Sequence, residues 1–186
     1  MTNHDCNVRL LCKFLENDCE KIDRLMELFT KFSAYLRATE TALAEIEYDP
    51  EDPEWEDVDP EEYVLERRLS GGLFTLQRLS IILAFAIVHN DKCAARATTK
   101  FQQEGVPAAT VHSYLREYLQ VLGKEIDDTA EQAGEEKAEG SVATQEREDL
   151  MREKTQQKDT LLAWSAVVGQ LTEGQRVEGS KAEPAS

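Results

Sequence analysis

The feature that most constrains this chain is a long apolar stretch from Tyr63 to Asn90. Hydrophobic residues recur in it at spacings of three and four, which predicts a helix with an apolar stripe along one side. Beyond Ser80 the stripe widens until the helix is apolar nearly all round, so protein must cover it on most sides. The stripe comprises Leu65, Leu69, Leu73, Leu76, Leu79 or Ser80, Leu83, Ala86 and Ile87, widened by Ile81, Ile82, Phe85 and Val88.

Two adjacent glycines, Gly71 and Gly72, interrupt this stretch and require a physical reason. A glycine inside a helix destabilises it by about 1 kcal/mol relative to alanine. Either a neighbouring helix approaches closely at this point, or the helix is kinked near residue 71. The sequence leaves both explanations open.

The apolar segment 69–88 is also long enough to be considered as a membrane span. Gln77 and Arg78 lie near its middle, however, and charged residues flank it on both sides. Polar and charged side chains are costly in the interior of a bilayer. The sequence therefore favours a buried core helix, and we expect no membrane partner.

The overall charge narrows the class of partner. The 186 residues carry a formal net charge of −16, with a pI near 4.6. The electrostatic field of such a negative charge repels phosphate groups. We therefore expect no direct nucleic-acid binding and favour partners with basic segments. The alternative is that the acidic residues only keep a helical protein soluble. The four cysteines lack the dense framework of a small secreted domain, which favours an intracellular protein with reduced thiols.

Residues 1–44 are expected to form an N-terminal helical hairpin, a partial repeat. Apolar residues at helical spacing predict one helix over 4–16 and a second over 19–46. Asn17 and Asp18 between them are good capping residues for the second helix. Paired helices of this kind are the unit of stacked helical repeats. The first helix has no upstream partner for its apolar face, so we expect this chain to be a fragment of a longer protein.

Residues 45–62 form an acidic segment of contrasting composition. More than half of its positions are Asp or Glu, and three prolines prevent a continuous helix. We therefore expect an extended, disordered loop. Trp55 either docks back on the core or anchors a partner. Together with its neighbours Glu54, Glu56 and Asp57, it forms a candidate partner-binding site.

Residues 63–123 predict a long helix, a short helix and a third helix, which is the pattern of an armadillo-type repeat. Asn90 and Asp91 begin the short helix and Gly105 ends it, while Gly123 is expected to end the third. Arginines and lysines gather near the central and following helices. Either the acidic loop covers and neutralises this basic strip, or both charges steer a partner. The strip comprises Arg67, Arg68, Arg78, Lys92, Arg96 and Lys100.

The remaining chain alternates between polar and helical patterns. Residues 124–147 have almost no large apolar side chain, which predicts a disordered linker. Residues 148–171 return to helical periodicity, and this helix either packs back on the domain or presents Trp164 to another chain. Residues 172–186 are expected to be a disordered tail.

No arrangement of residues in the sequence indicates catalysis, a cofactor or a metal. The glycine pair lacks the flanking residues of a nucleotide-binding loop. His89 and Cys93 are four residues apart, but a structural metal site needs about four ligands and no second pair has suitable spacing. We therefore expect a protein without enzymatic activity. An enzyme on a helical fold, using a pocket around His89 or His112, is the least favoured alternative.

Long segments of the chain resemble the C-terminal part of the beta-catenin-like protein 1 family. The resemblance is carried by RLLCKFLENDCEKIDRLMEL at 9–28, by YVLERRLSGGLFTLQRLSIILAFAI at 63–87 and by YLREY at 114–118. It covers roughly residues 8–123. It implies an all-α, armadillo-like helical repeat fold in the nucleus.

The same resemblance implies a non-enzymatic interaction scaffold associated with the spliceosome through the nineteen complex in pre-mRNA splicing. Members of the family bind basic, localisation-type segments of splicing factors and have been linked to self-association. The alternative function is a more general acidic helical adaptor that binds basic tails through the 45–62 loop.

Overall fold

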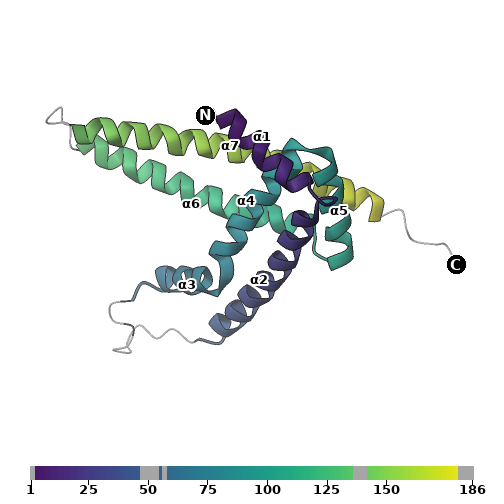
Figure 1. The fold of residues 1–186 in the computed structure, drawn as a ribbon. Coiled ribbons are helices and arrows are strands. Elements are labelled where there is room, and N and C mark those ends of the chain that lie inside the picture. Colours follow the sequence, from purple (N-terminus) through teal and green to yellow (C-terminus); the bar gives the residue numbers. More distant parts are fainter. Residues whose placement is uncertain (1–2, 47–54, 56–57, 136–141, 180–186) are drawn as a thin grey trace. The chain divides into compact units, whose positions relative to one another are not determined.

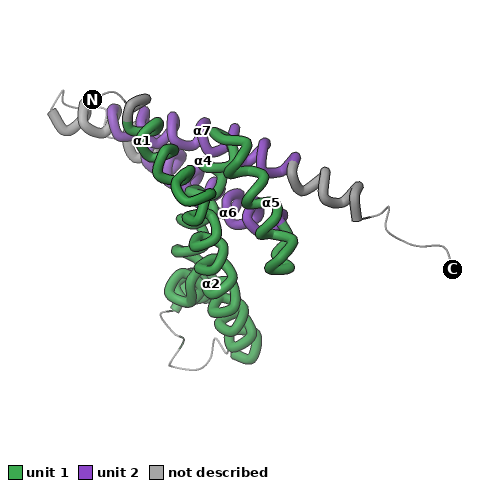
Figure 2. The backbone as a smooth tube through the Cα atoms, turned by 45° about the vertical axis from the view of Figure 1, so that its right-hand side comes forward, with its two compact units in different colours: residues 1–107 green, residues 108–186 purple. Residues whose placement is uncertain are grey.

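The computed structural model describes residues 3–46, 55, 58–135 and 142–179. Every regular element among these residues is helical (Figure 1), so the expected all-α class is confirmed. The chain divides into two compact units, residues 1–107 and 108–186 (Figure 2). The elements are α1 (Asn3–Leu15), α2 (Glu20–Ala44), α3 (Pro60–Arg68), the π-helical turn η1 (Leu69–Leu73), α4 (Phe74–His89), α5 (Asp91–Glu104), α6 (Ala108–Glu135) and α7 (Val142–Gly179).

Helix α2 is the central element of the first unit, where it contacts α1, α3, η1, α4 and α5. Its buried residues follow helical spacing and form one apolar face: Ile22, Met26, Phe29 and Leu36. Helix α4 is the most apolar element and buries residues on nearly all sides, as the sequence predicted. Burial of these aliphatic and aromatic side chains is the main stabilising contribution in the unit.

Helix α1 differs in detail from its sequence pattern, in which Val8, Leu11, Cys12 and Leu15 form the apolar stripe. Among the described side chains of α1, Phe14 is buried, whereas Val8 and Cys12 are exposed. The turn after α1 also differs, because Asn17, Asp18 and Cys19 all adopt positive φ, at 50°, 54° and 63°. Cys19 therefore occupies the capping position of α2, without a side-chain cap. The prediction that Asn17 or Asp18 caps this helix is wrong, because the left-handed turn moves both out of position.

Both explanations for the adjacent glycines hold in the structure. A Cβ atom at Gly71 would overlap the side chain of Thr39 on α2, so the first glycine permits close approach of the two helices. Gly72 has a φ of 120°, a conformation that residues with a Cβ rarely adopt, and it kinks the chain between α3 and α4. Gly71 thus allows the contact with α2, and Gly72 allows the bend between α3 and α4.

The kink changes the environment of the residues before it. Leu65 and Leu69 were predicted to share the buried stripe, but they are 38% and 37% exposed. In a straight helix, Leu65 and Leu69 would lie on the same face as the buried residues of α4. The bend at Gly72 turns α3 away from α4, so the two segments do not share one continuous face. Among the described residues, Pro60–His89 is the one helical stretch long and apolar enough to cross a membrane. Its apolar window is 61% buried within the protein, which is typical of a core helix.

Helix α5 begins and ends where its sequence predicts. The Asn90 side chain accepts hydrogen bonds from the backbone N–H groups of Lys92 and Cys93, at 2.9 and 3.3 Å. Gly105 closes the helix with a φ of 65°. These local signals are confirmed because each depends on residues within one turn of the helix end.

In the second unit, α6 and α7 lie side by side as an antiparallel hairpin (Figure 1). Gly123 does not end α6, which continues to Glu135. The described parts of the predicted 124–147 linker, 124–135 and 142–147, are helical, and 136–141 lie outside the described residues. The reason is tertiary, since α7 packs along α6 and Lys154 pairs with Glu125 at 3.0 Å.

The boundaries of the predicted domains also differ from those of the compact units. The expected 63–123 repeat crosses the boundary between the units, which falls after Pro107. Helix α7 runs from Val142 to Gly179 and so extends beyond the predicted 148–171 helix in both directions. Of the predicted 172–186 tail, 172–179 are helical and 180–186 lie outside the described residues.

Candidate protein-interaction site

The beginning of α3 is fixed by residues of the acidic segment. The Asp59 carboxylate accepts a hydrogen bond from the Glu61 N–H at 2.9 Å, and Pro60 occupies the first helical turn. Glu61 and Glu62 follow in the first turn, where negative charge is favourable. The acidic composition therefore has a structural role at this point as well as an electrostatic one.

Trp55 docks back on this helix. Its ring meets the Tyr63 ring edge to face, with centroids 5.2 Å apart and planes at 84°. The Arg67 guanidinium also lies over the Tyr63 ring, 5.1 Å from its centroid. This contact is with α3, a helix without buried residues, so the role of Trp55 in partner binding stays a prediction. Its neighbours Glu54, Glu56 and Asp57 lie outside the described residues.

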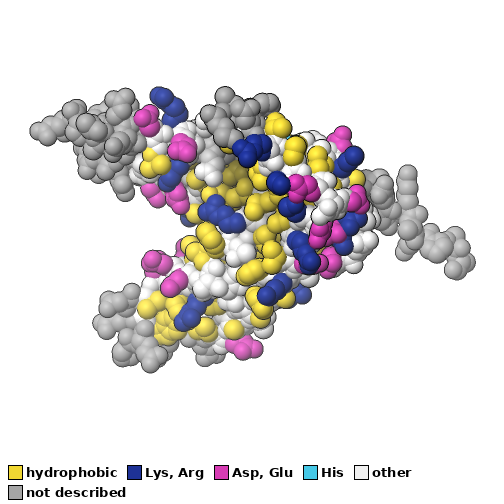
Figure 3. Space-filling model, in the orientation of Figure 1, with side chains coloured by type: hydrophobic (Ala, Val, Ile, Leu, Met, Phe, Trp, Pro, Cys, Tyr) yellow, Lys and Arg dark blue, Asp and Glu magenta, His cyan; other side chains and the backbone are white. Residues whose placement is uncertain are grey.

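A shallow apolar hollow lies on α3. Pro60, Glu61, Val64, Leu65 and Arg68 line this cavity, whose volume is about 410 Å³. Val64 is 41% exposed, and Figure 3 shows hydrophobic side chains gathered with charged ones over this helix. An exposed apolar surface with charged residues at its rim is typical of a protein-interaction site.

Three cations of the basic strip, Arg68, Arg96 and Lys100, pair with carboxylates of α2. Arg96 donates two hydrogen bonds to the Asp23 carboxylate, at 2.7 and 2.5 Å, and Lys100 lies 3.8 Å from it. Arg68 pairs with Glu40 at 3.0 Å. The hydrogen bond from Arg96 is the main reason that the pKa of Asp23 is lowered. A further carboxylate, that of Asp18 in the turn before α2, lies 3.9 Å from Arg96. Residues 47–54 and 56–57 of the acidic loop lie outside the described residues, so covering of the strip by this loop stays a prediction.

Trp164, the other predicted partner-binding residue, lies on α7 in the second unit and is half-buried. The structure therefore assigns it to a different unit from Trp55. The sequence pattern gave no other candidate in this unit, because residues 124–147 were expected to be disordered.

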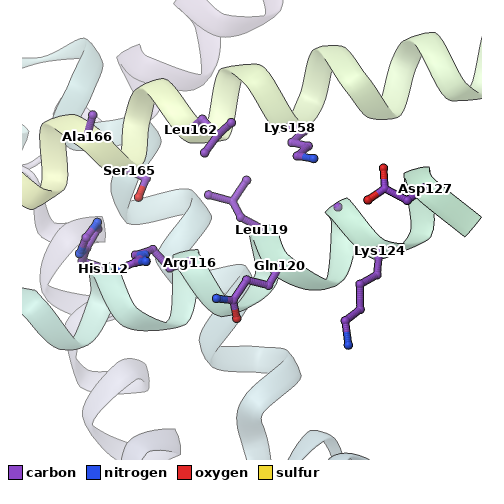
Figure 4. Close-up of a pocket in the computed structure, with 11 residues that line it drawn as sticks. His112, Arg116, Leu119, Gln120, Lys124, Asp127, Lys158, Leu162, Ser165 and Ala166 are labelled. Carbon is purple, nitrogen blue, oxygen red and sulfur yellow. The ribbon is translucent and has the colours of Figure 1, made fainter.

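The larger described cavity is a groove between α6 and α7, with a volume of about 810 Å³ (Figure 4). We call it the α6–α7 groove. Its lining mixes cations, leucines and small residues: His112, Arg116, Leu119, Gln120, Gly123, Lys124, Asp127, Lys158, Leu162, Ser165 and Ala166. Sequence reasoning missed this site. Its signal is the buried stripe Val111, Leu115, Leu119 and Leu122, against which α7 packs.

The residues considered for metal binding or catalysis are dispersed. His89 Nδ1 lies 2.9 Å from the Phe85 carbonyl oxygen, and its ring is tilted against the Phe85 ring with centroids 4.6 Å apart. Cys93 is buried, 4.0 Å from the sulfur of Cys19. His112 lines the α6–α7 groove, where burial and then the charge of Arg116 lower its pKa. Across the described part of the chain, no cluster of three or more His, Cys, Asp or Glu residues could hold a metal ion.

Comparison with known proteins places this architecture in a family. The profile of the family described as "Catenin-beta-like, Arm-motif containing nuclear" matches residues 1–116. The proteins named beta-catenin-like protein 1 of Homo sapiens, Bos taurus and Mus musculus are each 38% identical over 120 residues.

The aligned region covers 62% of this chain and 21% of each relative, so the chain spans about a fifth of the relatives that it matches. No solved structure matches the chain significantly. The match includes all of the first unit, with the kinked helix and the α2–α5 packing described above, and reaches the first turns of α6. The all-α fold is therefore armadillo-like, and the chain belongs to the catenin-beta-like, Arm-motif-containing nuclear family.

Proposed function

We propose that this chain is a non-enzymatic protein-interaction scaffold of the nucleus that takes part in pre-mRNA splicing as a component associated with the spliceosome. The family supports an interaction role, because its members carry Arm motifs and are described as nuclear. The assignment to splicing rests on the resemblance of residues 9–28 and 63–87 to the beta-catenin-like protein 1 family.

The proposed partners are proteins with basic segments, splicing factors among them. The acidic segment 45–62 supplies a high density of carboxylates, which attract lysine and arginine side chains over several ångströms. The hollow on α3 supplies an adjacent apolar surface around Val64 and Leu65. Lysine and arginine carry long apolar stems, so a basic segment can use both surfaces together.

The observation that carries this proposal is the contact between Trp55 and Tyr63. It anchors Trp55 on α3, the helix that carries the hollow, and a segment anchored at one residue has fewer conformations to lose when a partner binds. Preorganisation of this kind lowers the entropic cost of binding.

The test is calorimetric titration of the full chain with a lysine- and arginine-rich peptide of about 15 residues. The triple variant Glu54→Gln, Glu56→Gln and Asp57→Asn should weaken binding at least fivefold at low salt, because three charges are removed without a large change in shape. A matched control removes three exposed acidic charges from α7 by Asp149→Asn, Glu153→Gln and Asp159→Asn. Equal affinities of both variants would refute recognition by the acidic segment.

The splicing role is tested separately from peptide binding. Affinity purification of the tagged chain from nuclear extract should recover splicing factors, and the triple variant in the acidic segment should recover fewer of them. Binding of unrelated basic tails without any recovery of splicing factors would favour the alternative function, a general acidic adaptor.

A further inference from the structure

The α6–α7 groove has an electrostatic character opposite to that of the whole chain. Arg116, Lys124 and Lys158 contribute positive charge to its lining, against the single carboxylate of Asp127. The chain as a whole carries a net charge of −16. The groove is therefore a local exception and attracts a different class of ligand from the acidic segment.

Lys158 is the cation placed most directly in the groove. In Figure 4 its side chain extends from α7 towards α6. Its Nζ lies 3.2 Å from the point where a Cβ atom at position 123 would be, so Gly123 leaves room for the ammonium group. Lys154, one turn earlier on α7, pairs with Glu125 at 3.0 Å. Among the described residues, no carboxylate pairs with Lys158 within 4.0 Å.

Arg116 provides a second positive group on the same lining. It too has no ion-pair partner among the described side chains, and its charge contributes to the lowered pKa of His112 after the larger effect of burial. The two cations come from different helices, Arg116 from α6 and Lys158 from α7, so a ligand that contacts both must lie along the groove.

The groove also presents apolar surface between its charged groups. Leu119 of α6 is buried, and Leu162 of α7 is 48% exposed (Figure 4). A ligand that pairs with the cations can therefore place an apolar side chain against Leu162. A small anion would use the charges but leave this surface uncovered.

We propose that the α6–α7 groove binds an acidic segment of another protein, with carboxylates at Arg116 and Lys158 and an apolar side chain against Leu162. A protein segment is favoured over nucleic acid for two reasons. Apart from His112, the lining offers no aromatic ring for base stacking. A chain of net charge −16 also repels a long polyanion more strongly than a segment with a few carboxylates.

This site goes beyond the proposed function, which concerns basic partners of the acidic segment. It also lies largely outside the family match, which ends at residue 116. The two surfaces have opposite charge preferences, so one chain could hold a basic and an acidic protein segment at different places.

The experiment is fluorescence anisotropy of the full chain with a labelled 12-residue peptide of alternating Asp, Glu and Leu. Lys158→Glu and Arg116→Glu should each weaken binding at least tenfold. Arg152→Glu is the matched control, since Arg152 is an exposed cation of α7 that does not line the groove, and its variant should bind within twofold of the natural chain. Circular dichroism shows whether each variant retains its helices.

A second variant tests the shape of the groove without changing its charge. Gly123→Leu favours the helix but fills the floor beneath the Lys158 ammonium group, so it should also weaken binding at least fivefold. Three results would each overturn the proposal: no binding of the peptide, equal binding by the Arg152→Glu and Lys158→Glu variants, or tighter binding of a 12-nucleotide single-stranded RNA than of the peptide. Binding of the basic peptide at 45–62 is measured independently, so failure of one site is distinguishable from failure of the other.

Discussion

The sulfur atoms of Cys19 and Cys93 lie 4.0 Å apart in the interior of the first unit, although 74 positions separate the residues in the chain. Cys19 is the capping residue of α2 and Cys93 lies in the first turn of α5. The contact therefore joins the beginnings of two helices whose side chains also meet through Asp23 and Arg96. Cys6 and Cys12, in contrast, are exposed on α1.

This difference predicts two classes of thiol. With Ellman's reagent at pH 8, Cys6 and Cys12 should react within minutes, while Cys19 and Cys93 should react only after unfolding in guanidinium. Burial raises the pKa of Cys93 to about 11, with a smaller contribution from the neighbouring Cys19, so little reactive thiolate forms at pH 8. Cys6→Ser and Cys12→Ser together should remove the fast phase. Four equally fast thiols would show that the α2–α5 contact does not persist in solution.

The ion pair between Asp23 and Arg96 predicts a pH dependence of stability. The Arg96 hydrogen bonds hold the pKa of Asp23 below its ordinary value of 3.8. The stabilising contribution is therefore complete above about pH 4 and is lost as the pH falls through the lowered pKa, because the folded state then has to take up a proton that the unfolded state already carries. Denaturant unfolding of the natural chain and of Asp23→Asn, from pH 7 to pH 2, measures this difference.

At pH 7, Asp23→Asn should lower the free energy of unfolding by about 1 kcal/mol, since the pair is only partly buried. The two proteins should converge in stability at low pH. Glu16→Gln is the control, because Glu16 pairs with Lys13 and Lys21 at an exposed position and screening by solvent reduces its effect. A constant difference between the natural chain and Asp23→Asn at every pH would contradict the assignment.

The two glycines at the kink predict different responses to alanine. Gly72→Ala forces a Cβ into a φ of 120° and against Phe32, and should destabilise the first unit by about 2–3 kcal/mol. Gly71→Ala should also destabilise it, but through the side chain of Thr39. Combining Gly71→Ala with Thr39→Gly should therefore recover part of the loss, measured as a favourable coupling in a double-mutant cycle.

Thr39→Gly should give no comparable recovery with Gly72→Ala, because the backbone conformation at Gly72 remains unfavourable for alanine. Additive effects in both combinations would mean that α2 and η1 do not approach each other as described.

Exposed apolar residues on α1 and α2 predict self-association of the chain. Val8 and Leu10 on α1 and Leu28 on α2 are among the large hydrophobic side chains left uncovered. Helical repeats normally cover such faces with a neighbouring repeat. Sedimentation should show dimers or larger species above roughly 50 µM, a concentration range in which weak interfaces are populated. The double variant Val8→Asp and Leu28→Asp should remain monomeric, and a natural chain that is also monomeric at several hundred micromolar would exclude the prediction.

The sequence by itself determined the helical class, the family and those helix ends whose signals are local. Asn90 and Gly105 delimit α5 through hydrogen bonds and backbone angles within one turn, so the residue types alone suffice. The resemblance of residues 9–28 and 63–87 indicated the family for a similar reason, because a long motif can be recognised from the order of its residue types alone.

Only the tertiary structure decided what distant residues do to one another. Gly71 has its role because Thr39 lies opposite it, and Leu65 and Leu69 are exposed because the chain bends at Gly72. Gly123 was expected to end α6, but the helix continues through it because α7 packs alongside. The α6–α7 groove could not be foreseen for the same physical reason: its charge and shape arise where two helices meet, and neither helix carries that information alone.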